Sequence, residues 1–317
     1  MKKKIMQALV LADRKGLKHE DWLALRRQGI GGSDAGAICG LNPFSTPFSV
    51  YADKLGLTQE KEETEAMRIG NDLEEYVAQR FTEATGKKVK KCNFVLQHPQ
   101  YSWMLADVDR LIVGENAGLE CKTTSAFNKT DFTKADIPQQ YYVQCVHYMA
   151  VTGAERWYLE VVVLGLGAYN FVIERNEEEI KALIDLEREF WENHILAKVE
   201  PPVDGRPQTS DAINDIYLPV EGESIDLLPY RELLDKYQVL KKQEEAITAE
   251  KELIKQELQV YMATATEGFA DGYTVSWKQQ CRNTIDTKRL QAEHPDIYNA
   301  YLRQSFSRPF KIVKKEG

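Results

Sequence analysis

Two short segments decide the fold of this chain: Ala106-Asp107-Val108-Asp109-Arg110-Leu111 and Gly118-Leu119-Glu120-Cys121-Lys122-Thr123. Their apolar content and the glycine-containing turn between them predict two neighbouring antiparallel strands. Side chains two positions apart on a strand point to the same face, so Glu120 and Lys122 should emerge together. A turn centred between Gly114 and Glu115 would place Asp109 opposite Glu120. We therefore expect two carboxylates and one ammonium group in a single patch.

The chemistry of such a patch suits phosphodiester hydrolysis. Mg²⁺ binds through one or two carboxylates while it keeps waters and phosphate oxygens as further ligands. A lysine beside the metal can orient the attacking water or help to deprotonate it, and the metal lowers the pKa of that water. The alternative interpretation is a cross-strand ion pair on a solvated face. These residues alone leave both interpretations open, because similar acidic-x-lysine triplets recur elsewhere in the chain.

The elements around this patch predict an α/β fold with a mixed central sheet flanked by helices. Helices are expected at 20–28, 33–39, 47–56, 65–85, 137–151 and 176–198, and strands at 89–97, 103–113, 118–124, 156–164 and 169–174. Ser33 or Asp34 is expected to cap the second helix. The fourth helix should bury an apolar stripe that includes Met67 and Ile69, and Gly86 should end it. A polar stretch at 125–136 is expected to be a mobile loop.

A second region follows the proline-rich stretch at 200–207, so we expect a catalytic domain at 1–205 and a C-terminal helical or α+β interaction region at 206–317. A long helix is predicted at 230–262, followed by a hairpin at 269–279 and a helix near Thr287. Apolar residues of the long helix follow a heptad seam that Glu244 and Lys251 interrupt. Those interruptions favour an antiparallel pair, or a helix lying on its own domain, over a parallel dimer.

Bulk composition narrows the class of protein. The chain has 317 residues, 43% of them hydrophobic and 28% charged, with a net charge of −8. This balance argues against coating of nucleic acid by general electrostatic attraction, although not against a local grip on DNA. Five scattered cysteines argue against a disulfide framework and against a cysteine-based zinc site. No apolar run is long enough for a membrane span or a secretion signal, so we expect a cytoplasmic protein without membrane contact.

Five blocks of sequence resemble the YqaJ-type viral recombinase and lambda-exonuclease-like family. They occur in the family's order and span roughly residues 20 to 175. The blocks are Trp22-Leu23-Ala24-Leu25-Arg26; Gly29-Ile30-Gly31-Gly32-Ser33-Asp34; Gly70-Asn71-Asp72-Leu73-Glu74; the Asp109 and Glu120-x-Lys122 strands; and Tyr142 to Met149 with Thr152-Gly153. One departure is Arg110, which stands where many relatives have glycine.

The resemblance implies a restriction-endonuclease-like core and a role for each matched position. Asp109 and Glu120 would be metal ligands, Glu74 would support a second metal or its water, and two Mg²⁺ or Mn²⁺ ions are expected. Lys122 would be the catalytic lysine, and Gln144 would orient the nucleophile or that lysine. Arg26 and Ser33 would hold a terminal 5′-phosphate, because a guanidinium matches phosphate oxygens with two parallel donors. Asp107, acidic and on the same predicted strand, keeps the assignment of metal ligands open.

The function implied by the resemblance is a DNA exonuclease of phage or prophage recombination. Such an enzyme acts at duplex ends, in the 5′ to 3′ direction, and leaves 3′ single strands for a single-strand annealing protein. The resemblance also suggests a homo-oligomer, a ring trimer by analogy. Two alternatives remain: an endonuclease or single-strand nuclease on the same core, and a catalytically silent DNA-binding scaffold for the annealing protein. The C-terminal region is expected to bind that partner or to stabilise the ring.

Overall fold

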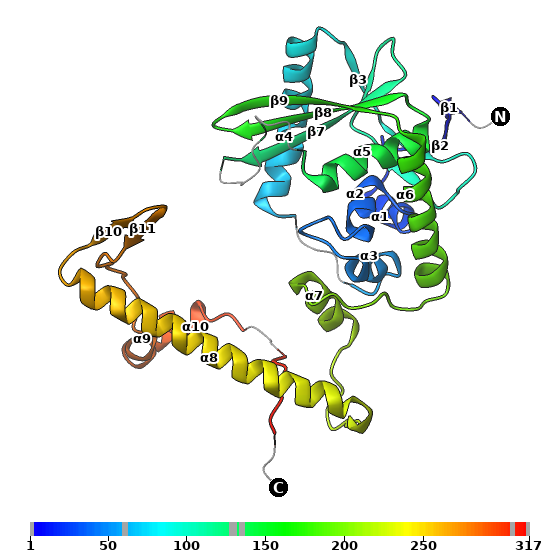
Figure 1. Ribbon diagram of the computed structural model, residues 1–317. Coiled ribbons are helices and arrows are strands. Elements are labelled where there is room, and N and C mark those ends of the chain that lie inside the picture. The colour runs from blue at the N-terminus through cyan, green and yellow to red at the C-terminus, as the bar shows by residue number, and fades with distance from the viewer. Residues whose placement is uncertain (1–2, 59–62, 127–131, 133–136, 305–307, 315–317) are drawn as a thin grey trace. The chain divides into compact units, whose positions relative to one another are not determined.

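The computed structural model describes residues 3–58, 63–126, 132, 137–304 and 308–314. Its internal contacts divide the chain into two units, Met1–Pro219 and Val220–Gly317. Figure 1 shows a mixed α/β arrangement in the first unit and one long helix with a small hairpin in the second. The predicted loop at 125–136 falls largely outside the described residues. Among the described residues, no helix combines the length and the apolar character that a membrane span needs.

The first unit carries two sheets and the helices that cover them. Its strands are β1 (Lys4–Ile5), β2 (Ala8–Asp13), β3 (Val89–Lys91), β4 (Phe94–Gln97), β5 (Leu105–Asp107), β6 (Arg110–Ile112), β7 (Ala117–Ser125), β8 (Arg156–Leu164) and β9 (Gly167–Glu174). Its helices are α1 (His19–Arg26), α2 (Gly32–Ile38), α3 (Pro47–Lys54), α4 (Glu65–Thr85), α5 (Gln139–Thr152), α6 (Glu177–Phe190) and α7 (Pro207–Ile216), and the last turns of α6 continue as a π-helix at Trp191–Leu196.

The central sheet is mixed, as predicted. Its strand order is β3-β6-β7-β8-β9, with β7 and β8 parallel and the other neighbours antiparallel. A second sheet has the order β1-β2-β4-β5. The stretches 89–97 and 103–113, each predicted as one strand, are therefore two strands each, and the halves belong to different sheets. The chain changes sheets just before Asp109, which is the position that matters for the site.

The two faces of the central sheet are covered by different helices. On one face, Ala78 and Phe81 of α4 pack against Leu119 of β7. On the other, Cys145 and Met149 of α5 belong to the main core together with residues of β8 and β9. Figure 1 shows α4 and α5 on either side of the strands. Because side chains alternate along β7, Leu119 faces α4 while Glu120 faces α5.

Helix ends follow local chemistry. Gly86 ends α4 with a left-handed φ of 71°, as predicted, because the missing Cβ removes the steric penalty there. The residue that caps α2 is Gly31, so the prediction of Ser33 or Asp34 was wrong; instead the carboxylate of Asp34 reaches back to the backbone N–H of Gly31. The predicted stripe on α4 is buried only in its second half, since Met67 and Ile69 are 56% and 38% exposed.

The boundary between the units lies later than 205. Helix α7 packs against α3 in the first unit, where Ala212 contacts Phe48 and Ala52. The second unit holds α8 (Arg231–Met262), β10 (Glu267–Ala270), β11 (Tyr273–Ser276), α9 (Thr287–Glu293) and α10 (Pro295–Ala300). The long helix, the hairpin and the helix near Thr287 all match the sequence prediction.

Candidate active site

The geometry of the site starts from the register of β6 and β7. Arg110 pairs with Leu119 and Leu111 with Gly118, so the next residues along the ladder, Asp109 and Glu120, lie opposite one another. Opposed residues of an antiparallel pair point to the same face. The carboxylate of Asp109 is held by the backbone, because its Oδ2 accepts the N–H of Cys121 at 2.8 Å. The predicted patch is therefore present.

Glu120 is the most enclosed acid of this patch, with 2% exposure. Its Oε1 lies 2.5 Å from Nζ of Lys122 and accepts a hydrogen bond from Nε2 of Gln144 at 2.7 Å. Its other oxygen, Oε2, is buried and has no hydrogen-bond partner among the described residues. A buried carboxylate oxygen without a donor is costly, and a cation would satisfy it. Two carboxylates with an unmatched oxygen are a donor set of the hard kind that Mg²⁺ and Mn²⁺ prefer.

The electrostatics of the patch also favour a bound cation. Burial, followed by the neighbouring charge of Glu120, raises the pKa of Asp109 well above the usual aspartate range. Burial likewise raises the pKa of Glu120, and Lys122 offsets only part of that rise. For Lys122 burial favours the neutral amine, but the two carboxylates outweigh it and raise its pKa, so it carries its charge. One ammonium group thus stands beside two closely spaced acids, which leaves them short of positive charge.

A cavity of about 210 Å³ connects this patch to the N-terminal helices. Asp109, Glu120, Lys122 and Gln144 form one part of its lining. Another part comes from α1, α2 and the residue that caps α2, and consists of Trp22, Arg26, Gly31, Gly32 and Ser33. Six of the seven predicted site residues therefore line one cavity, although they come from distant parts of the sequence.

The cationic end of the cavity is built around Arg26. Its guanidinium lies over the ring of Trp22, 5.0 Å from the centroid, and donates to Oγ of Ser33 at 3.3 Å. Asp34 stands 3.9 Å from the same guanidinium. Lys54, fully buried, lies 2.6 Å from Asp34 and donates to the backbone carbonyl of Arg26 at 3.1 Å. The contact with Lys54 holds the backbone of Arg26, and the contacts with Trp22, Ser33 and Asp34 position its guanidinium. A guanidinium held beside a hydroxyl suits a phosphate group.

Glu74 is the one predicted residue that does not line the cavity. It lies on α4, over the face of the sheet that carries Arg110. Arg110, itself 2% exposed, donates to Glu74 and also to Glu75 at 2.9 Å, and Nζ of Lys91 lies 3.2 Å from Glu74. Burial opposes ionisation of Glu74, but the hydrogen bond and charge of Arg110 lower its pKa. Its carboxylate is therefore already neutralised by two cations.

Asp107 also has its own partners. Its Oδ1 forms an ion pair with Arg14 at 2.6 Å, and its Oδ2 accepts the indole N–H of Trp22 at 3.3 Å. The side chain lines the cavity, but both of its oxygens are used. Within the described residues, no three acidic, histidine or cysteine side chains gather into a metal cluster. Asp109 and Glu120 are thus the pair left to hold an ion.

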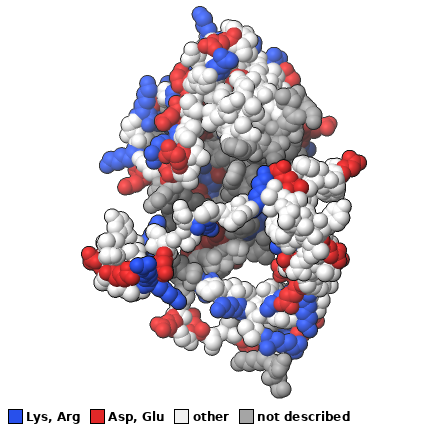
Figure 2. All heavy atoms as spheres, turned by 90° about the vertical axis from the view of Figure 1, so that its left-hand side faces the viewer, with Lys and Arg blue, Asp and Glu red and all other residues white. Residues whose placement is uncertain are grey.

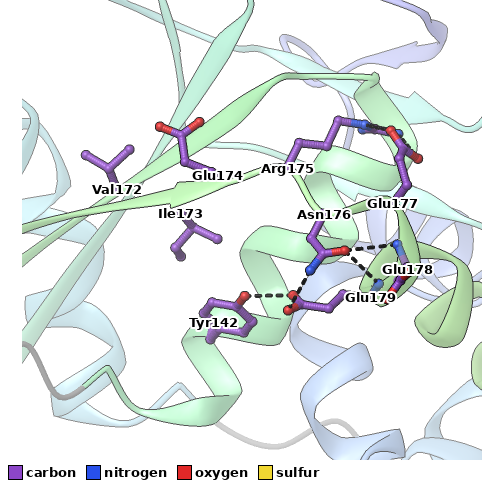
Figure 3. A pocket seen from close by; sticks show the side chains of 9 residues that line it. All are labelled: Tyr142, Val172, Ile173, Glu174, Arg175, Asn176, Glu177, Glu178 and Glu179. Atoms are coloured by element: carbon purple, nitrogen blue, oxygen red, sulfur yellow. Dashed lines mark hydrogen bonds and ion pairs between the residues drawn. The ribbon is translucent and has the colours of Figure 1, made fainter.

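A second, larger hollow offers much poorer chemistry. It measures about 730 Å³ and lies where β9 meets the start of α6 (Figure 3). Its polar groups are engaged with each other: Asn176 caps the helix by accepting the N–H groups of Glu178 and Glu179, and Tyr142 donates to Glu179 at 2.7 Å. Arg175 is paired with Glu177. Among its described lining residues, this hollow lacks a pair of buried acids with raised pKa values such as Asp109 and Glu120 in the 210 Å³ cavity.

Comparison with known proteins identifies the family. The model of the YqaJ-like viral recombinase domain matches residues 21–155. The chain is also 38% identical over 312 residues to the uncharacterized protein YqaJ of Bacillus subtilis (strain 168), covering 96% of this chain and 98% of that protein. The chain belongs to the YqaJ-like viral recombinase family. The resemblance noted in the sequence is thereby confirmed, and all seven predicted site residues of this YqaJ-like chain lie within the matched segment.

Two solved structures resemble part of the YqaJ-like chain. One is an alkaline exonuclease, LHK-Exo, from Laribacter hongkongensis, with 20% identity and a TM-score of 0.47 over 56% of this chain and 93% of that one. The other is a phage-related exonuclease from Haemophilus somnus 129PT, with 14% identity and a TM-score of 0.41 over 54% of this chain and 96% of that one.

Sequence reasoning missed three residues that support the YqaJ-like site. Lys54 is the buried partner of Asp34, and no sequence signal distinguishes it from a lysine near a helix end. Tyr148 accepts Nε2 of Gln144 at 2.9 Å and donates to the carbonyl of Asp107 at 3.1 Å. Its position four residues after Gln144 was the available signal, because such a spacing puts two side chains on one helix face. The third is Arg110, which sequence reasoning noted only as a departure.

His147 has a structural role in this YqaJ-like chain. The ring is fully buried, with Nδ1 at 2.7 Å from Glu187 and Nε2 at 2.9 Å from the carbonyl of Leu105. When Glu187 is ionised both neighbours are acceptors, and the ring then donates to both as an imidazolium. It joins α5, which carries Gln144 and Tyr148, to α6 and β5.

Two thiols lie against the acids of the site. Burial and then the charge of Asp109 raise the pKa of Cys121, and burial and then Glu120 raise the pKa of Cys145. In the metal-free protein both thiols therefore stay protonated, which disfavours either one as a nucleophile.

Proposed function

We propose that the chain is a metal-dependent deoxyribonuclease that hydrolyses phosphodiester bonds at the ends of duplex DNA. The observation that carries this proposal is the pair of buried, undercompensated carboxylates, Asp109 and Glu120, in one cavity with Lys122 and Arg26. Membership of a viral recombinase family supports a role in phage or prophage recombination. A bound Mg²⁺ or Mn²⁺ would polarise the scissile phosphate and lower the pKa of a water molecule.

Each side chain then has a definite task. Asp109 and Glu120 would hold the cation, with the N–H of Cys121 fixing the first and Gln144 fixing the second. Lys122, charged and next to Glu120, would hold the attacking water or stabilise negative charge on the phosphate. A second ion would require Glu74 to exchange its arginine and lysine partners for a metal, so the two-ion arrangement stays a prediction.

The position of Arg26 supports action at a DNA end. Arg26 and Ser33 lie in the same cavity as the acids, where they would bind the terminal 5′-phosphate while the next bond is cut. Charge on the face shown in Figure 2 is mixed, with basic and acidic side chains interspersed. With a net charge of −8, this suits a local grip on a DNA end rather than a long electrostatic track. We therefore propose 5′ to 3′ digestion that leaves a 3′ single strand. The annealing-protein partner, the ring oligomer and the cytoplasmic location stay predictions.

The test is digestion of labelled duplexes by the purified full chain. We expect release of nucleotides from linear ends with Mg²⁺ or Mn²⁺, faster with a 5′-phosphate than with a 5′-hydroxyl, and none in EDTA. Glu120→Gln should lower the rate by about 10³-fold or more, as expected for a group required in the transition state. Asp107→Asn is the matched control, because its carboxylate lines the same cavity but is paired with Arg14; its rate should change little.

Other outcomes point elsewhere. Cutting of a covalently closed circle, or of single strands alone, would indicate an endonuclease or single-strand nuclease on the same core. Intact DNA under both metals, or a Glu120→Gln variant as active as the parent, overturns the nuclease proposal. If calorimetry then also shows no divalent cation uptake that Asp109→Asn abolishes, the scaffold interpretation replaces it.

A further inference from the structure

The second unit presents an apolar stripe along its long helix. In α8, which Figure 1 shows as one uninterrupted helix, apolar side chains recur at alternating spacings of three and four residues. The members of this stripe, here called the α8 seam, are Leu233, Tyr237, Leu240, Ile247, Ile254, Leu258 and Tyr261. Their exposed fractions run from 44% for Leu258 to 90% for Tyr261. Such spacing is typical of a helix that packs against another helix along its whole length.

The second unit has no core of its own that uses this seam. None of its described residues is buried, including those of α8, the hairpin β10–β11 and the two short helices. A helix of 32 residues with this much exposed apolar surface is not explained by contacts within the unit. The seam is thus a surface that a partner helix would cover.

Two charged residues within the seam indicate which partner fits. Glu244 and Lys251 occupy the two seam positions that the apolar residues leave open. If a second copy of α8 paired in parallel, Glu244 would face Glu244 and Lys251 would face Lys251 inside the interface. Like charges at such positions oppose association. A parallel pair is therefore disfavoured by the sequence of the seam itself.

Antiparallel pairing removes both conflicts. When two copies are centred between Glu245 and Ala246, Leu240 of one lies opposite Lys251 of the other, and Glu244 lies opposite Ile247. Glu244 of one copy and Lys251 of the other then fall in adjacent layers, about 6 Å apart along the axis at 1.5 Å per residue. Opposite charges become neighbours, within reach of the long lysine side chain.

The residues that flank the seam show the same preference. Lys236 and Glu257 each precede a seam residue, Tyr237 and Leu258. In the antiparallel arrangement Lys236 of one copy lies beside Glu257 of the other, which gives two ion pairs. In a parallel arrangement Lys236 would instead lie beside Lys241 of the other copy, and Glu250 beside Lys255, so one like-charge contact would offset one ion pair. The seam charges and this flanking pair thus both favour the antiparallel geometry.

We propose that α8 pairs with α8 of a second copy of this chain as an antiparallel two-helix coiled coil centred between Glu245 and Ala246. The first test reverses the seam charges in the full chain and measures the association constant by sedimentation across a dilution series. Glu244→Lys and Lys251→Glu should each weaken association by about tenfold or more, since each places like charges in adjacent layers. The double variant restores opposite charges and should associate within about threefold of the parent.

Equal association of the parent, both single variants and the double variant would show that the seam charges do not meet, which overturns the proposal. A parent chain that stays monomeric at every concentration overturns it too, because the helix is then covered within its own chain. An oligomer held together by the first unit is recognised in the same experiment, since its association responds to neither single reversal.

The second test reads the direction of pairing by disulfide formation. In a Cys281→Ser background, Leu233→Cys and Leu258→Cys together should give a covalent dimer under mild oxidation, because residues 233 and 258 of opposite copies share a layer. Within one helix the two positions are about 37 Å apart, so they cannot bridge each other. Each single cysteine variant should remain uncrosslinked. A covalent dimer from Leu233→Cys alone indicates parallel pairing and refutes the proposal. Neither readout depends on nuclease activity.

Discussion

Replacing Asp109 by asparagine should stabilise the metal-free protein while it removes the response to a divalent cation. Asparagine keeps a carbonyl oxygen for the N–H of Cys121, so the backbone contact is retained. What is lost is a negative charge that burial and Glu120 both disfavour. A buried polar or charged group that lacks sufficient partners costs about 1–3 kcal/mol. We expect a gain of about 1–2 kcal/mol at neutral pH, or roughly 2–8 °C in Tm for a unit of this size.

The pH dependence of this gain has a definite sign. A carboxyl group whose pKa is raised on folding binds more protons in the folded state than in the unfolded state. The metal-free parent therefore loses stability as pH rises from the usual aspartate value of 3.8 through the raised pKa. The variant lacks that loss. The difference between the two proteins should thus be largest near neutral pH and vanish below about pH 4.

A bound cation should reverse the order of stability. With the cation at 100 times its Kd, the free energy of unfolding of the parent rises by about 2.7 kcal/mol. That of Asp109→Asn rises little, because a neutral amide replaces one of the two carboxylates that would bind the cation. The assay is thermal unfolding followed by circular dichroism, first in EDTA and then through a Mg²⁺ or Mn²⁺ titration. Asp107→Asn is the control and should keep the metal-induced shift of the parent. The reasoning fails if Asp109→Asn melts below the parent in EDTA or keeps the same metal-induced shift.

Three further predictions concern the surroundings of the site. Arg26→Lys should reduce the preference for 5′-phosphorylated over 5′-hydroxyl ends by about tenfold, measured as a ratio of digestion rates, because two parallel donors are lost. Gly32→Ala should cost about 1–3 kcal/mol in urea unfolding, since its Cβ would lie 2.6 Å from the ring of Tyr148; an unchanged midpoint would contradict that contact. For His147, burial favours the neutral ring, but Glu187 outweighs it and raises the pKa above 6.5. The stability that this ion pair contributes should fall as pH rises through the raised pKa, and urea unfolding of His147→Gln across that window should lack the fall.

The strand pair at the centre of the site was predictable from sequence because its geometry is local. A short turn at Gly114 fixes the register of the two strands, and the alternation of side chains then fixes which residues share a face. Asp109 and Glu120 meet for that reason. The helix predicted at 137–151 is present as α5. It places Gln144 on the face that contacts β7, where Gln144 donates to Glu120.

The features that the sequence did not reveal depend on tertiary contacts. The pairing of Glu74 with Arg110 on the α4 face of the sheet was not foreseen, because no local pattern indicates it; the role of Glu74 at a second metal stays a prediction. The stretch 103–113 is likewise split because its first half pairs with β4 in one sheet and its second half with β3 and β7 in the other. Lys54 pairs with Asp34 because α3 packs beside α2, so this pairing could not be read from spacing.

The protonated thiols beside the acids bear on how the protein tolerates oxidants. Sulfenic acid formation and alkylation both need a thiolate, and the raised pKa values of Cys121 and Cys145 suppress it at neutral pH. Burial also raises the pKa values of Cys92 and of Cys39, the latter to about 11. Cys281 is the exposed thiol. Maleimide dyes should therefore modify the folded chain at Cys281 alone, which allows fluorescent labelling of the second unit while the candidate active site stays unmodified.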